Sequence, residues 1–121
     1  MFNGSATALV TPFTDDDHID FQRYGQLIDW QIENGTSALI VLGTTGETPT
    51  ITEDEQREIM AFAIAHVNGR VPVAIGTGSN ATAKAIKNTQ LAESLGADAA
   101  LIVNPYYNKS SQIGIVKHYE A

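Results

Sequence analysis

Short apolar runs alternate along the chain with longer segments in which apolar residues recur at helical spacing. The apolar runs are rich in alanine and β-branched residues, which is typical of buried parallel strands. Strands are therefore expected over residues 5–12, 38–42, 71–75 and 99–103. Helices are expected over residues 21–34, between the cap at 52 and the glycine at 69, over 81–95, and from Ser110 or Ser111 onward.

Capping residues mark the ends of these helices. Asp20 precedes the first helix as an N-cap, and Thr52 with Glu55 forms an S/T-x-x-E capping box for the second. Glycines of the C′ type follow three helices, at positions 35, 69 and 96. Trp30 on the first helix is expected to have a packing role, and Ile113, Val116 and Tyr119 begin an apolar stripe on the fourth helix.

The order of elements predicts an α/β fold of four consecutive βα units, with a parallel sheet and right-handed crossovers. Two architectures fit: the N-terminal half of a (β/α)8 TIM barrel, or a rearranged, open flavodoxin-like parallel sheet. A complete barrel needs about 250 residues, whereas the chain has 121 and ends inside its fourth helix. We therefore expect residues 1–121 to form a single (β/α)4 half-barrel unit of a truncated barrel.

Composition narrows the class of protein. The net charge is −7, from 7 basic and 14 acidic residues, and the basic residues form no patch that would suit nucleic acid. There is no cysteine, which excludes disulfides, Fe–S clusters and thiolate zinc sites. No apolar run reaches the ~18 residues of a membrane span, and residues 1–5 do not resemble a signal peptide. The sequence predicts a cytoplasmic protein without nucleic-acid or membrane partners.

The residues that follow each strand are the candidates for chemistry, because parallel α/β folds place their sites at the carboxyl ends of strands. Gly43-Thr44-Thr45-Gly46-Glu47 follows the second strand. Its glycines allow a tight turn with free backbone N–H groups, and two hydroxyls add donors, which suits a small carboxylate. The alternative is a structural turn in which the threonines satisfy only the backbone.

Two further segments follow the third and fourth strands. Gly76-Thr77-Gly78-Ser79-Asn80-Ala81 matches a loose dinucleotide fingerprint, but no acidic residue ends the next strand, so a structural turn or the wall of another site is the favoured interpretation. Pro105-Tyr106-Tyr107-Asn108 places two phenols at the rim, either for packing or for proton relay. The three histidines share no ligand spacing, so no metal site is expected.

In order and spacing, these three segments resemble the N-terminal half of the dihydrodipicolinate synthase family. The resemblance spans the chain and implies a (β/α)8 lyase, an oligomer built from tight dimers, that condenses pyruvate with aspartate semialdehyde in lysine biosynthesis. It implies a Schiff base between pyruvate and a lysine, and no cofactor or metal. It implies a proton-relay role for Thr44, a carboxylate-binding role for Thr45, and for Tyr107 a relay role in the neighbouring subunit's site.

The resemblance also implies an effector pocket. Asn80 and Tyr106 match positions that line the lysine pocket of feedback-inhibited members, and Lys84 stands where a glutamate often pairs with the lysine amine. Because two cations repel each other, the sequence predicts weak or absent lysine inhibition.

One part of the implied chemistry has no candidate residue. The four lysines, at positions 84, 87, 109 and 117, lie on predicted helices or in a loop, and none ends a strand. A Schiff-base lysine needs a poorly solvated pocket that lowers its pKa. We therefore predict that the isolated chain has no synthase activity. The alternative hypothesis is that the chain is a non-catalytic half-barrel folding module that associates with copies of itself. Such a module could be natural or engineered.

Overall fold

The computed structural model describes residues 3–121; Met1 and Phe2, the start of the stretch compared above with signal peptides, lie outside the described residues. The strands are β1 (Ala6–Ala8), β2 (Ala38–Val41), β3 (Val73–Gly76) and β4 (Ala99–Leu101). The α-helices are α1 (Phe21–Glu33), α2 (Glu53–Val67), α3 (Thr82–Leu95) and α4 (Gln112–Glu120). Two 3₁₀ turns, η1 (Thr44–Gly46) and η2 (Thr48–Thr50), connect β2 to α2.

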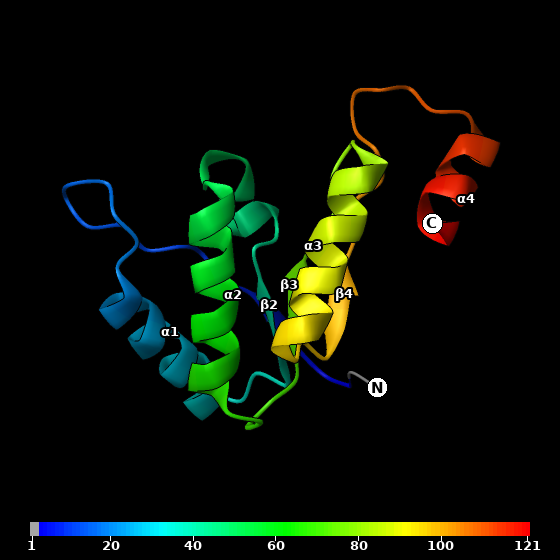
Figure 1. Cartoon of the computed structure of the whole chain (residues 1–121). Coiled ribbons are helices and arrows are strands. Elements are labelled where there is room, and N and C mark those ends of the chain that lie inside the picture. The colour runs from blue at the N-terminus through cyan, green and yellow to red at the C-terminus, as the bar shows by residue number, and fades with distance from the viewer. Residues whose placement is uncertain (1–2) are drawn as a thin grey trace.

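The sheet has the strand order β1-β2-β3-β4, and every pair is parallel. Consecutive helices lie side by side, with α1 against α2 and α2 against α3 (Figure 1). In a βα barrel, neighbouring strands follow one another in the order of the sequence, as they do here. In a flavodoxin-like sheet the strand order is 2-1-3-4-5, so the first strand lies between the second and the third. The half-barrel prediction is confirmed, and the alternative of a rearranged open sheet is wrong.

The predicted helix boundaries hold because their caps form. Asp20 accepts a hydrogen bond from the Arg23 N–H at 2.9 Å, and both halves of the Thr52–Glu55 capping box are present. Gly35, like the glycines at 69 and 96, has the positive φ of a C′ residue. Each cap satisfies backbone groups that the helix leaves unpaired, so the ends of the helices are set locally.

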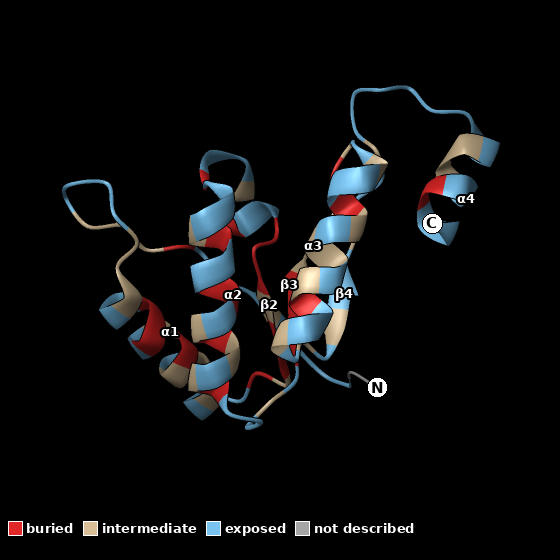
Figure 2. Ribbon diagram, in the orientation of Figure 1, coloured by how far each residue is buried: buried red, intermediate tan, exposed pale blue. Residues whose placement is uncertain are grey.

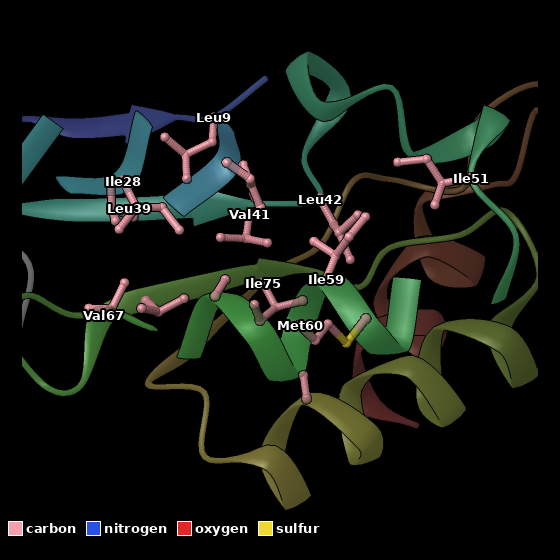
Figure 3. Close-up of a cluster of buried hydrophobic side chains, with 14 residues drawn as sticks. Leu9, Ile28, Leu39, Val41, Leu42, Ile51, Ile59, Met60, Val67 and Ile75 are labelled. Carbon is pink, nitrogen blue, oxygen red and sulfur yellow. The ribbon is translucent and has the colours of Figure 1, made fainter. Parts of the chain in front are cut away.

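The core lies between the sheet and the helices (Figure 3). The strand register places Val41 beside Ile75, on the face that meets the helices, and both are fully buried. Ile59 and Met60 of α2 are buried in the same cluster. A fully buried aliphatic side chain stabilises a fold by roughly 1.5–3 kcal/mol, so this layer supplies the main apolar stabilisation of β2 and β3.

The carboxyl-terminal part of the structure carries much less buried surface, as Figure 2 shows for α4. Ile113 is 71% exposed, and Val116 and Tyr119 on the same helix are about half exposed. The described chain therefore leaves this apolar stripe largely exposed. The predicted packing role of Trp30 of α1 is wrong, because its side chain is 57% exposed. The reason is that α1 uses its opposite face, with Tyr24 and Ile28, against the core.

A polar cluster joins α1 to α2 at the surface. Asp29 accepts a hydrogen bond from Arg70 at 2.7 Å and lies 3.0 Å from Nε2 of His66. The pKa of the Asp29 carboxyl lies below its ordinary value because of the hydrogen bonds from Arg70 and His66. Phe62 stacks on the His66 ring at 5.3 Å, and Gly25 of α1 leaves the space that this ring fills.

Candidate active site

A cavity of about 420 Å³ lies at the carboxyl ends of β2, β3 and β4. Its volume is within the range of roughly 300–1,000 Å³ found for small-molecule sites. Apolar and glycine positions that follow the strands form much of the wall, including Leu42, Gly43, Gly76, Gly78, Leu101 and Val103. The position agrees with the rule that parallel α/β sheets bind ligands at this edge.

The turn that carries the two threonines is held from two sides. Thr11, at the end of the first strand segment, donates to the Gly46 carbonyl at 2.8 Å and is buried. Thr48 donates to the carbonyls of Leu42 at 2.7 Å and Gly43 at 3.0 Å. Both anchors bind backbone oxygens, so hydrogen bonds from outside the turn help to fix the path of residues 43–47.

Thr44 and Thr45 themselves are exposed in η1, and Thr44 lines the cavity. In the part of the chain that the structure describes, neither residue's N–H donates to another backbone group, whereas the next two N–H groups close the 3₁₀ turn. Successive unpaired N–H groups in a turn can form an anion-binding arrangement. Thr45 lies outside the cavity lining, and carboxylate binding by this segment stays a prediction.

The glycines of the third segment allow the backbone of this segment to pack closely against the backbones of Leu42 and Val103. A Cβ at Gly76 would overlap the Leu42 carbonyl, and a Cβ at Gly78 would lie 2.5 Å from the Val103 N–H nitrogen. Both glycines line the cavity. Gly76 and Gly78 thus have a structural reason that needs no dinucleotide, and the assignment of 76–81 as a structural turn or the wall of another site stays a prediction.

Gln56 is a site residue that the sequence did not reveal. It is buried on α2, and its side-chain amide donates to the carbonyls of Ile51 at 2.8 Å and Thr48 at 3.2 Å. It lines the cavity and holds η2 above it. A glutamine on the first turns of a helix carries no local signal for this role, because both acceptors come from the preceding loop.

Lys84 of α3 also lines the cavity, and an acidic residue of α2 lies near it. Glu53 is 3.5 Å from the Lys84 ammonium and 2.9 Å from that of Lys87. Hydrogen bonding from Lys87, and then from Lys84, holds the pKa of the Glu53 carboxyl below its ordinary value. One carboxylate thus serves two ammonium groups.

The remaining predicted positions lie around the rim. Tyr106 lines the cavity together with Thr44 and Lys84. Asn80 lies outside the lining, where its carbonyl accepts from the Asn108 side chain at 2.7 Å. Tyr107 is 95% exposed and has a positive φ, so within one chain it makes little contact.

Residues 3–121 contain no group of three histidine, aspartate or glutamate side chains arranged to hold a metal ion. Over the same residues, no helix is both long and apolar enough to cross a membrane.

Comparison with known proteins decides the family. The model of the dihydrodipicolinate synthetase family matches residues 1–121. The chain belongs to this family. A 4-hydroxy-tetrahydrodipicolinate synthase from Kosmotoga olearia is 53% identical over 121 residues, which are all of this chain and 41% of the relative.

Solved structures of the family agree with the fold. A dihydrodipicolinate synthase from Bacillus anthracis aligns with a TM-score of 0.97 and 45% identity, over 99% of this chain and 41% of that one. The chloride-inhibited enzyme from Acinetobacter baumannii, complexed with pyruvate, aligns with a TM-score of 0.97 and 42% identity, over 99% and 41%. The family resemblance is confirmed, and the chain spans about 41% of the length of these relatives.

Proposed function

We propose that this chain forms the amino-terminal half of the active site of a cytoplasmic lyase. The lyase condenses pyruvate with aspartate semialdehyde through a lysine Schiff base, in lysine biosynthesis. The observation that carries this proposal is the cavity at the strand ends, lined by Thr44, in a chain that matches the family model from end to end. The pyruvate complex of the Acinetobacter baumannii relative supports the choice of substrate.

Each predicted residue has a role in this proposal. Thr45 and the two unpaired N–H groups of η1 bind the pyruvate carboxylate. Thr44 passes protons through its hydroxyl, and Tyr107 continues that relay in the neighbouring subunit of a homo-oligomer. Its 95% exposure suits a side chain whose partners lie on another subunit. Asn80, Lys84 and Tyr106 are effector-pocket positions with weak affinity for lysine.

The nucleophile belongs to the part of the barrel that this chain does not span. Lys84 and Lys87 lie on α3, Lys109 follows β4 and Lys117 lies on α4. None of these amines is buried, whereas a Schiff-base lysine is activated by desolvation. The isolated chain is therefore inactive as a synthase. Incubation with pyruvate and borohydride is expected to leave its mass unchanged, and a trapped adduct would contradict this.

A complementation experiment tests the site itself. The chain is expressed with the carboxyl-terminal part of the Kosmotoga olearia relative, and synthase activity is expected to return. Thr44→Val should then lower kcat by about 10²-fold, the usual contribution of a proton-transfer group. Thr50→Val, a threonine of η2 outside the cavity lining, is the matched control. Equal activity of the two variants would remove Thr44 from the relay.

A second candidate function is a non-catalytic folding module that associates with copies of itself. The exposed apolar residues Ile113, Val116 and Tyr119 of α4 favour it, because exposed apolar surface can mark an interface. Two measurements together distinguish the functions. A folding module gives a defined oligomer of the isolated chain in light scattering and no gain of activity in the complementation experiment.

A further inference from the structure

Two helices are followed by the same dipeptide, Asn-Gly. Asn34-Gly35 follows α1, and Asn68-Gly69 follows α2. All four residues are exposed, and both glycines have a positive φ, of 88° and 72°. In an Asn-Gly pair the glycine nitrogen can attack the asparagine side chain with little obstruction, because glycine has no side chain of its own. The two pairs therefore share one intrinsic reactivity and differ in their hydrogen bonds.

Hydrogen bonds hold both reacting groups of the pair after α1. The side-chain amide of Asn34 donates to the Trp30 carbonyl at 2.8 Å. The Gly35 N–H donates to the Ile32 carbonyl at 3.1 Å. Ring closure joins the amide carbon to the glycine nitrogen, so both hydrogen bonds must break before the two atoms meet. Because each bond stabilises the folded arrangement, the fold protects Asn34.

The pair after α2 lacks this protection. The Asn68 backbone N–H donates to the Ile64 carbonyl at 3.1 Å, which completes the end of the helix. Among residues 3–121, however, neither the Asn68 side-chain amide nor the Gly69 N–H has a hydrogen-bond partner. A methyl group added at Gly69 would meet nothing within 4 Å. Both reacting groups therefore face solvent, and no hydrogen bond holds them apart.

We propose that Asn68 is a site of spontaneous deamidation in the folded chain. The Gly69 nitrogen attacks Cγ of Asn68, and the bond from Cγ to the side-chain nitrogen breaks. That nitrogen leaves as ammonia, with the proton that the Gly69 nitrogen gives up, and a cyclic succinimide remains. Water then opens the ring at either carbonyl to give aspartate or isoaspartate. The reaction goes beyond the proposed function, because it uses neither the Schiff base nor the proton relay.

The site lies inside a turn that Arg70 closes. Arg70 Nε donates to the Val67 carbonyl at 3.1 Å, and its Nη2 donates to the His66 carbonyl at 2.9 Å and to Asp29 of α1 at 2.7 Å. Isoaspartate routes the main chain through its side chain and so lengthens the backbone between Val67 and Arg70. The α1–α2 contact is therefore expected to loosen in the isoaspartyl product, whereas the aspartyl product keeps the backbone length.

Tryptic peptides separate the three Asn-Gly pairs of the sequence, because Asn3, Asn34 and Asn68 fall in residues 1–23, 24–57 and 58–70. The 121-residue chain is incubated at mildly alkaline pH below its unfolding temperature, and the deamidated fraction of each peptide is followed by mass spectrometry against a zero-time digest. Asn68 is expected to convert about tenfold or more faster than Asn34, since two hydrogen bonds protect the latter. In concentrated urea the two rates should become nearly equal, because these hydrogen bonds are lost.

Variants connect the modification to the α1–α2 contact. Asn68→Gln should abolish the mass change in residues 58–70 and leave conversion at Asn34 unaltered, because the longer side chain closes a larger ring far more slowly. Asn68→Asp supplies the aspartyl product without isoaspartate. After incubation, the parent chain should unfold at a lower urea concentration than Asn68→Asp, while incubated Asn68→Gln should unfold as its fresh sample does.

Equal conversion at Asn34 and Asn68 in the folded chain would overturn the proposal. A difference that persists in urea would also overturn it, because sequence and not the fold would then set the rates. Conversion of Asn68 in urea but not in the folded chain would show that the fold protects this site too. None of these outcomes bears on borohydride trapping or on the complementation experiment, so the proposed function is tested separately.

Discussion

The carbonyl oxygen of Leu42 lies where the first side-chain atom of any residue larger than glycine would begin at Gly76. Leu42 has a φ of 57°, in the left-handed region that non-glycine residues rarely adopt. This conformation ends β2 and directs its last carbonyl toward β3. The approach of the two backbones forms the floor of the cavity, so a strained leucine and an obligatory glycine act together there.

Gly76→Ala is expected to lower the free energy of unfolding by about 2–3 kcal/mol, because the new methyl group meets backbone that has little room to move. Gly43→Ala is the matched control, since its Cβ would first meet the flexible Ile40 side chain at 3.5 Å and its φ is −77°. Urea unfolding measures both. Equal losses in the two variants would show that β2 and β3 separate easily.

Tyr24→Phe is expected to leave the stability unchanged or to raise it by up to about 1 kcal/mol. Tyr24 is fully buried, and among residues 3–121 its hydroxyl has no hydrogen-bond partner; burial also raises the pKa of the phenol. Removing an unpaired hydroxyl removes a desolvation cost.

The control for this substitution is Tyr119→Phe, whose hydroxyl donates to the Ile102 carbonyl at 3.1 Å and contacts Asn104 Oδ1 at 2.7 Å. This variant should lose about 0.5–1.5 kcal/mol. Thermal unfolding should show a lower midpoint for Tyr119→Phe and an unchanged or higher midpoint for Tyr24→Phe, and a loss of stability in Tyr24→Phe would indicate a partner for that hydroxyl.

Asp29→Asn tests the pH dependence of the α1–α2 contact. Because Arg70 and His66 hold the pKa of Asp29 below its ordinary value of 3.8 in the fold, the folded state binds this proton less readily than the unfolded state. The stabilisation is present above about pH 4 and is lost as the pH falls through the folded pKa. The variant should be less stable at neutral pH, by under about 1 kcal/mol for a pair this exposed.

Urea unfolding from neutral to acidic pH should therefore show a shallower decline for Asp29→Asn than for the parent. Asp15→Asn, in the exposed loop before α1, removes the same charge without removing an ion pair in the described residues. If both variants follow the parent curve, the Asp29 contact contributes nothing measurable.

Val116→Lys tests self-association through α4. The exposed apolar stripe of this helix should be covered in an oligomer, and a lysine there should lower the association constant by about tenfold or more. Trp30→Lys places a lysine on an exposed apolar position of α1 as the control. Sedimentation of both variants decides, and equal effects would show that association is not confined to α4.

The elements of the fold could be predicted because their signals are local. The Thr52–Glu55 capping box and the glycine after each of three helices lie within one turn of the boundary that they mark. The family resemblance could also be recognised from the sequence, because it depends on short segments that directly follow strands. The choice between a half-barrel and an open sheet could not be made from the sequence. It depends on which strands pair, and the hydrophobic periodicity carries no information about strand pairing.

The parts that escaped prediction depend on contacts far apart in sequence. Gln56 matters through carbonyls of a loop, and Thr11 holds a turn that begins more than thirty residues later. The predicted packing of Trp30 failed for a related reason, because the helical pattern shows a stripe of apolar residues but not which of them the neighbours cover.

Tyr119 has a consequence for the segment that precedes it. Its hydroxyl reaches back to Ile102 and Asn104, and the Asn108 side chain donates to the Asn80 carbonyl at 2.7 Å. Residues 105–120 are therefore tied at two points to residues that precede them. The 95% exposed Tyr107 directly precedes Asn108, so a change at Asn80 would displace this tyrosine without any change in α4.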